Sequence, residues 1–139
     1  MFIIRIMAVC VLSRALKDQT SDLFQNAILN TIYRRHLNGR AFVNDPDVFF
    51  ARKTNIKFNQ KQKELLAKIN SLLGGVIFVS DNVGDYNEES KALFKDTIKK
   101  KDIKILDVEQ LLSIITIKYL EDNEEKKLRF DLEIGEILN

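Results

Sequence analysis

The chain has 139 residues, of which 45% are hydrophobic and 30% are charged. This composition is typical of one globular domain, or a piece of one, and excludes a disordered tail. The formal net charge is only +2, so we expect no nucleic acid among the partners. With one cysteine and one histidine, the chain has neither an internal disulfide framework nor a histidine-rich metal site.

The N-terminal stretch MFIIRIMAVCVLSR is apolar and carries an early Arg5. The apolar run after Arg5 extends only from Ile6 to Leu12, which is too short to span a bilayer, and no small-residue cleavage pattern follows it. We therefore favour a buried β-strand here over a targeting peptide and expect no membrane association. The lack of disulfides makes the cytoplasm the expected location.

Three stretches with apolar residues at three- and four-residue steps predict helices. Each is bounded by residues that favour helix ends, such as Asn or Ser at the start and Gly at the end. The expected boundaries, in chain order, are Ser21 or Asp22 to Gly39, Asn59 to the Gly74–Gly75 pair, and Glu88 to about Lys99.

Short apolar runs separate these helices. The runs AFV, at 41–43, and VIFVSDN, at 76–82, predict two further strands. The resulting βαβαβα order, up to about residue 105, is typical of a parallel sheet buried under helices. The residues alone leave open a doubly wound sheet or part of a (β/α)8 barrel, because three strands cannot close a barrel of eight.

The last part of the chain has a different pattern. The runs SIITIKYLED and KKLRFDLEIGEI flank a polar NEE turn and predict a β-hairpin from a separate antiparallel element. Residues 100–113 would form the junction between the two parts.

Each predicted strand-to-helix turn carries carboxylates. They are Asp18 and Asp22, then Asp45 and Asp47 around the only proline, Pro46, then Asp81 and Asp85. Parallel α/β folds bring such turns to one rim, where sugar, metal or phosphate chemistry takes place. The alternative is that aspartate is simply common in turns and at helix caps.

Two of these turns lie in recognisable motifs. GRAFVNDPDVFFAR followed by LLGGVIFVSDN resembles the carboxyl half of the catalytic barrel in α-galactosidases of glycoside hydrolase family 36. SRALKDQTSDLF resembles the family's sixth-strand segment, in which an arginine precedes the acid/base aspartate by four residues; here these are Arg14 and Asp18. KILDVEQLL and the hairpin resemble the passage into the family's C-terminal β domain. The resemblance covers about residues 13–130.

The resemblance implies an α/β fold in two parts. Residues 1–105 would be the C-terminal part of a (β/α)8 TIM barrel, about strands 6 to 8, and residues 106–139 the start of an antiparallel C-terminal β domain. The implied reaction is retaining hydrolysis of terminal α-galactosides in oligosaccharides, without cofactor or metal.

The resemblance also implies residue roles. Asp18 would be the acid/base, and Arg14 would bind substrate hydroxyls and bias the protonation of its neighbour. The remaining matched residues would support the site. They are Asn44, Asp45, Asp47 and Asp81.

Several family features have no counterpart in these residues. The family's nucleophile, an aspartate on the fourth strand, has no match, and the tryptophan usual before NDPD is absent. We therefore expect a fragment with little or no activity alone, and its preference for galactose or N-acetylgalactosamine depends on residues upstream. The main alternative is a non-catalytic α/β fragment that acts only by pairing with a partner chain, either its own copy or the missing N-terminal part.

Two further interpretations of the whole chain are weaker. A carbohydrate-binding module is disfavoured because the chain has few aromatic residues. A nucleotide domain is disfavoured because Gly74–Gly75 follow a predicted helix and precede a predicted strand, the reverse of the order in a phosphate loop.

Arg52 closely follows NDPDVFFA, so we expect a salt bridge from Arg52 to one aspartate of that turn.

Overall fold

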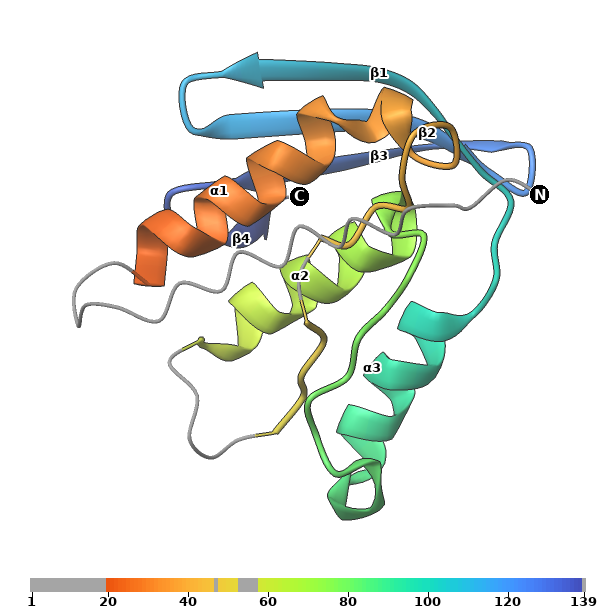
Figure 1. Ribbon diagram of the computed structural model, residues 1–139. Coiled ribbons are helices and arrows are strands. Elements are labelled where there is room, and N and C mark those ends of the chain that lie inside the picture. The colour runs from red at the N-terminus through yellow and green to blue at the C-terminus, as the bar shows by residue number, and fades with distance from the viewer. Residues whose placement is uncertain (1–19, 47, 53–57, 139) are drawn as a thin grey trace.

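The computed structural model describes residues 20–46, 48–52 and 58–138. Within these ranges, three α-helices and two short 3-10 turns precede a four-stranded sheet (Figure 1). In chain order the elements are α1 (Thr20–Tyr33), η1 (Arg35–Leu37), α2 (Gln60–Leu73), η2 (Val83–Asp85), α3 (Glu88–Ile98), β1 (Ile103–Leu111), β2 (Ile114–Glu121), β3 (Glu124–Asp131) and β4 (Glu136–Leu138).

The sheet is an antiparallel meander in the order β1-β2-β3-β4. Asp122 and Asn123 connect β2 to β3 and have φ angles of 52° and 69°. Two consecutive positive φ angles are what a type I′ hairpin turn requires, and Asp and Asn tolerate them better than most residues. The predicted hairpin is therefore confirmed, although it forms the centre of a larger sheet.

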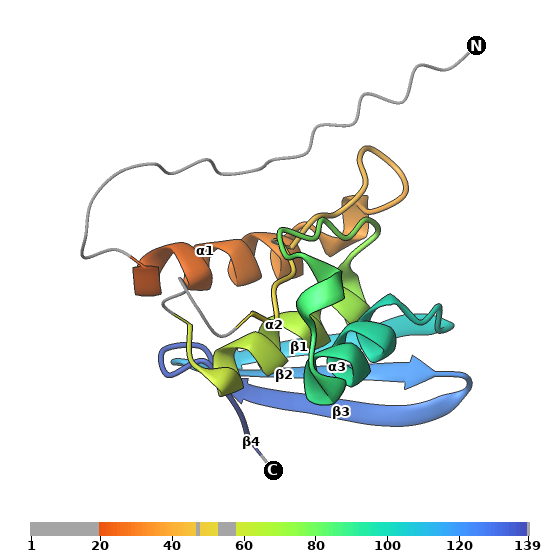
Figure 2. The ribbon, with the colours of Figure 1, turned by 90° about the horizontal axis from the view of Figure 1, so that it is seen from below.

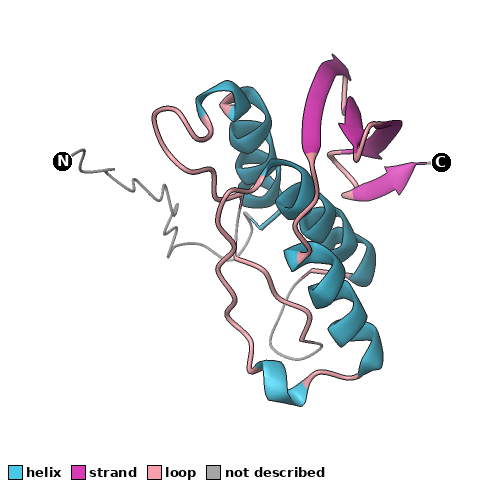
Figure 3. Ribbon diagram, turned by 90° about the vertical axis from the view of Figure 1, so that its right-hand side faces the viewer, coloured by secondary structure: helices cyan, strands magenta, loops and turns pink. Residues whose placement is uncertain are grey.

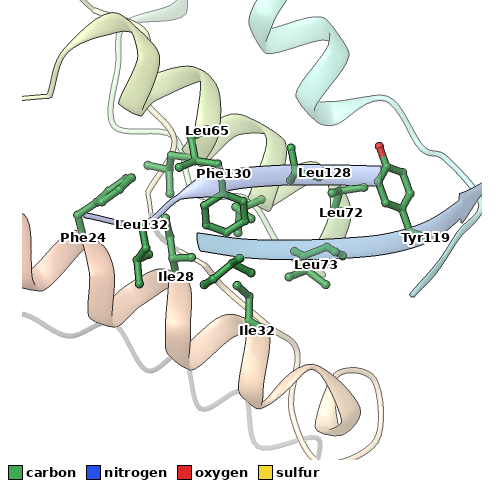
Figure 4. Close-up of a cluster of buried hydrophobic side chains, with 14 of the residues drawn as sticks. Phe24, Ile28, Ile32, Leu65, Leu72, Leu73, Tyr119, Leu128, Phe130 and Leu132 are labelled. Atoms are coloured by element: carbon green, nitrogen blue, oxygen red, sulfur yellow. The ribbon is translucent and has the colours of Figure 1, made fainter. Parts of the chain in front are cut away.

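One face of this sheet packs against α1 and α2 (Figure 4). Alternate residues of β2 point to this face, because successive strand side chains point to opposite sides of a sheet. Burial of this apolar surface is the main stabilising contribution in this half of the molecule. The shared core includes Phe24, Ile28, Ile32, Leu65, Ile69, Leu72, Ile115, Ile117, Tyr119, Leu128 and Phe130.

A second, smaller cluster lies on another side of α2. It joins Phe49 and Ala51 to Ala67 of α2 and to Tyr86, with Phe94 of α3 packed against them. Figures 2 and 3 show the resulting order of layers: the sheet, then the helices, then extended loops on the side away from the sheet. Most described residues of the two α-galactosidase-like motifs lie in these loops, whereas Leu72 and Leu73 belong to α2.

The predicted helices are present with small differences at their ends. Asn59 caps α2 in a reciprocal capping box with Gln62, and Gly74 follows its last residue, as expected. Asn87 caps α3, which spans Glu88–Ile98. The first helix starts at Thr20 and ends at Tyr33, so it stops before Gly39, which lies beyond η1 with a φ of 74°.

The prediction of a partial TIM barrel is wrong. The described sheet is antiparallel, and the first run expected as a strand lies outside the described residues. The two described runs, 41–43 and 76–82, take part only in the isolated parallel bridges Asn38–Phe42 and Phe49–Val79. A parallel strand needs a neighbouring strand that forms hydrogen bonds with its backbone over several residues, and each described run forms only one bridge. The expected junction at 100–113 contains β1, whose Ile103, Ile105 and Val108 pack against the core.

Candidate functional site

The two motifs with catalytic resemblance lie side by side. The Phe49 N–H donates to the Phe78 carbonyl at 2.7 Å, and the Ser80 N–H donates to the Phe49 carbonyl at 3.3 Å. Further along, the Gly75 N–H donates to the Asn44 carbonyl at 2.8 Å. Residues 44–46 and 48–52 therefore lie alongside residues 75–81, although the whole of α2 separates them in the chain.

Asp81 is the centre of this contact. Its Oδ2 accepts hydrogen bonds from the backbone N–H groups of Ala51 at 2.5 Å and Arg52 at 3.0 Å, and from the Tyr86 hydroxyl at 2.7 Å. Its Oδ1 accepts from Arg52 Nη1 at 2.5 Å. The Asp81 side chain is only 1% exposed, so all four donors replace water around one carboxylate.

These contacts set the protonation of the cluster. Burial alone would raise the pKa of Asp81, but the hydrogen bonds from Tyr86, Ala51 and Arg52 together outweigh it and lower the pKa below 3.8. Burial raises the pKa of Tyr86, and the hydrogen bond to the Asp81 anion raises it further. Near neutral pH, the pair is therefore a carboxylate and a neutral phenol.

Arg52 pairs with a different aspartate from the one predicted. We expected a salt bridge within the NDPD turn, but the guanidinium binds Asp81 and also donates to Ser80 Oγ at 2.9 Å. The Arg52 carbonyl accepts from Lys63 Nζ of α2 at 2.6 Å. The arginine thus links three separate parts of the chain through its side chain and its backbone.

Asn44 is a second cross-link, at the other end of the paired segments. Its side-chain Nδ2 donates to the carbonyls of Thr31 at 3.2 Å and Leu73 at 3.1 Å, which lie in the last turns of α1 and α2. Carbonyls there have no partner within the helix, so Asn44 satisfies two of them at once. Asn38 Oδ1 accepts from the Asn44 N–H at 2.8 Å. Asn44 is 5% exposed.

The other predicted acidic and basic residues do not belong to the Asp81 cluster or lie outside the described ranges. Asp45 is half-buried beside Pro46. Asp85 is exposed and accepts from Asn82 Nδ2 at 2.9 Å, so it belongs to the η2 turn rather than to the Asp81 cluster. Of the predicted site residues, three lie outside the described ranges: Arg14, Asp18 and Asp47.

The chemistry open to this cluster follows from its contacts. Asp81 is buried and already accepts four hydrogen bonds, so it holds two segments together and has no exposed oxygen for a ligand. Within the described ranges, no three Asp, Glu, His or Cys side chains gather in a way that could hold a metal ion. The described cluster therefore holds Ala51 and Arg52 against Asp81 and α2.

Two members of the cluster were not predicted from the sequence. These members are Tyr86 and Lys63. Lys63 is a buried lysine, 6% exposed, in the middle of an amphipathic helix. Lys63, Ala67 and Asn70 share one face of α2, which is not the face of the leucine stripe. This spacing indicates that the helix has a second buried face, and it could have identified Lys63.

Among the helices of the described ranges, none combines the length and the apolar character needed to cross a bilayer. No known protein-family model matches this sequence.

Proposed function

We propose that this chain takes part in the retaining hydrolysis of terminal α-galactosides, as the part of a cytoplasmic enzyme that carries the acid/base. The observation that supports this proposal is the meeting of its two motifs in space. Phe49, from the NDPDVFFAR motif, pairs with Val79 of the VIFVSDN motif, and Arg52 binds Asp81 across the same contact. The resemblance places the two motifs on neighbouring segments, and in this chain they are neighbours.

The proposed chemistry divides between two carboxylates. Asp18 would give its proton to the leaving glycosidic oxygen and then take a proton from water, while Arg14 would bind sugar hydroxyls. The nucleophilic carboxylate would come from outside these residues. Asn44 and Asp81 would act indirectly, by fixing the loop that includes Asp45 and Asp47.

The test exploits the lack of a nucleophile. The purified chain is incubated with an aryl α-galactoside that has a poor leaving group, with and without a high concentration of azide. Azide would attack the anomeric carbon while the glycosidic C–O bond breaks and Asp18 protonates the leaving oxygen, giving β-galactosyl azide. The matched variants are Asp18→Asn and Asp96→Asn, since Asp96 is an exposed residue that pairs only with Lys101 in the described part.

We expect no hydrolysis without azide, and slow formation of β-galactosyl azide with it. Asp18→Asn should abolish this product, whereas Asp96→Asn should leave it unchanged. Hydrolysis without azide that Asp18→Asn removes would show that a nucleophile lies within the chain. No azide product from the folded chain would contradict the acid/base role of Asp18.

A second candidate is a non-catalytic role that depends on pairing with a partner chain. It is favoured by apolar side chains that the described structure leaves uncovered next to the Asp81 cluster. Phe78 is 45% exposed and Val83 is 41% exposed.

A further inference from the structure

The sequence contains a single Asn-Gly pair, Asn38–Gly39, in the connection between η1 and the NDPD motif. An asparagine before glycine is prone to spontaneous deamidation, because glycine has no side chain to keep its backbone nitrogen away from the asparagine Cγ. In this reaction the Gly39 nitrogen forms a bond to Asn38 Cγ, the bond from Cγ to Nδ2 breaks, and the amide proton leaves with Nδ2 as ammonia. Water then opens the resulting succinimide ring to aspartate or isoaspartate, so water is the only other reactant.

The fold holds this pair in a conformation that does not react. Asn38 has a φ of −61° and a ψ of 127°, in the extended region. In an L-residue this ψ turns the following nitrogen toward Hα and away from Cβ, so the Gly39 nitrogen reaches Cγ only after a large rotation about the Asn38 Cα–C bond. The Gly39 N–H also donates to the Phe42 carbonyl at 2.8 Å. Ring closure therefore requires that this turn opens.

The Asn38 side chain is also held. Its Oδ1 accepts from the Asn44 N–H at 2.8 Å, and its Nδ2 donates to the Leu73 carbonyl at 3.4 Å. Asn44 Nδ2 donates to the same carbonyl at 3.1 Å, so both asparagines attach the connection to the end of α2. We refer to Asn38, Gly39, Phe42, Asn44 and Leu73 as the asparagine cluster. Its contacts fix both the carbon that is attacked and the nitrogen that attacks it.

Opening of the asparagine cluster needs no change in the apolar core. Gly39, Arg40 and Ala41 are exposed, and Asn38 and Phe42 are half-buried. Segments with little buried apolar surface and few hydrogen bonds open more often than the core does. We propose that Asn38–Gly39 is a site of spontaneous deamidation that reacts when the asparagine cluster opens locally, and that the reaction then keeps the cluster open. This proposal does not depend on the α-galactosidase proposal.

Neither product can rebuild the asparagine cluster. Both lack the side-chain amide of Asn38, so the N–H donor to the Leu73 carbonyl is lost. In aspartate a carboxylate oxygen takes its place and repels the carbonyl oxygen. Isoaspartate routes the backbone through the former side chain, and the added methylene disrupts the pairing of position 38 with Phe42. A transient opening of the connection thereby becomes permanent.

The test is the rate at which Asn38 deamidates in the full chain, in buffer and in concentrated urea. Trypsin releases residues 36–40 as a peptide whose only asparagine is Asn38, and chromatography with mass spectrometry separates its asparagine, aspartate and isoaspartate forms. The variant is Asn44→Ala, which removes two side-chain bonds to carbonyls at the ends of α1 and α2. The matched control is Asn87→Ala, which removes the N-cap of α3 and leaves the asparagine cluster intact. Circular dichroism checks that each variant is folded in buffer.

We expect the same deamidation rate in urea for all three chains, because that rate depends only on the local sequence. In buffer the unsubstituted chain should react more slowly by about tenfold or more, since only the opened fraction reacts. Asn44→Ala should raise the rate in buffer by about tenfold, whereas Asn87→Ala should leave it unchanged. Equal rates in buffer and urea, or equal acceleration by both variants, would overturn the proposal.

Amide hydrogen exchange gives a readout that needs no substitution. The Gly39 N–H exchanges when its bond to the Phe42 carbonyl opens. Folding should therefore slow this exchange and the deamidation of Asn38 by factors within about tenfold of each other, and both by less than it slows exchange in β2. Deamidation that is slowed as strongly as exchange in β2 would show that the reaction needs global unfolding. That result would overturn the proposal even if Asn44→Ala failed to fold.

Discussion

The sheet region consists of β1–β4 with α1 and α2, and the loop region consists of residues 42–46, 48–52 and 74–87. The two regions differ in which groups form hydrogen bonds with the backbone. In the sheet region, ladder and helix hydrogen bonds pair the backbone groups, and apolar side chains fill the space between. In the loop region, the side chains of Asn44 and Asp81 take over much of this pairing. The loop region thus depends on a few polar residues, whereas the sheet region depends on many apolar ones.

Because of this difference, we expect substitutions in the two regions to affect stability in different ways. A core side chain shares its contribution with many neighbours, and its loss leaves a cavity while the fold persists at lower stability. A buried carboxylate that serves four donors is different, because its loss leaves several buried polar groups unsatisfied at once. We therefore expect damage in the sheet region to be global and damage in the loop region to be local.

The largest expected effect is that of Phe130→Ala. Phe130 is fully buried in β3 at the centre of the shared core, so its removal should lower the free energy of unfolding by about 3–5 kcal/mol. Urea denaturation followed by circular dichroism measures this change. Leu111→Ala is the control, because Leu111 is exposed, and it should stay within about 0.5 kcal/mol of the unsubstituted protein. Equal losses in both variants would contradict the assignment of the core.

The next effect is that of Asp81→Asn, which keeps the shape but removes the charge and turns one acceptor into a donor. We expect a loss of about 2–4 kcal/mol, because the Ala51 and Arg52 donors and the Arg52 guanidinium lose their anionic partner. Hydrogen exchange should accelerate at Ala51 and Arg52 and remain slow in β2 and β3. Uniform acceleration throughout the sheet would show that the two regions unfold as one. Asp85→Asn, at an exposed aspartate, serves as the control.

The pH dependence of this variant gives a smaller and more specific test. The folded state lowers the pKa of Asp81, so the carboxylate stabilises the protein above the ordinary value of 3.8, and this stabilisation is lost as the pH falls through the lower folded-state pKa. The difference in unfolding free energy between the unsubstituted protein and Asp81→Asn should therefore be constant near neutral pH and shrink below about pH 4. Urea titrations over this range measure it, and a difference that grows on acidification would have the wrong sign.

The smallest expected effect is that of Gly39→Ala in the connection between the two regions. Gly39 has a φ of 74°, and a Cβ there would meet no atom within 4 Å, so only backbone strain opposes the substitution. We expect a loss of about 1 kcal/mol in thermal or urea unfolding. Gly84→Ala has no positive φ and should cost less. A larger cost at Gly84 would contradict the strain argument.

The sequence allowed correct prediction of the elements with strong local signals. Asn59 caps α2, Gly74 follows the end of α2, and Glu88 is the first residue of α3. The two runs around the NEE turn form the β2–β3 hairpin. In each case residues within a few positions of one another carry the information, through capping, apolar period or turn chemistry.

The architecture was not predictable in the same way. The runs at 41–43 and 76–82 have the composition of buried parallel strands, yet in the described structure they form isolated bridges. The composition of a segment indicates that it can form a β-strand. Whether it pairs depends on a second strand elsewhere in the chain, which the residues of the segment do not determine. β1 was missed for the opposite reason: its apolar alternation is interrupted by the bulge near Leu106.

The sequence by itself therefore determined the helices, the hairpin and the presence of acidic turns, because these depend on neighbours along the chain. Only the tertiary structure decided which aspartate Arg52 binds, since Asp81 lies 29 residues away. It also decided that Asn44 joins the ends of two helices. Such outcomes depend on which segments meet after the core has formed, and packing of distant surfaces rather than local propensity selects them.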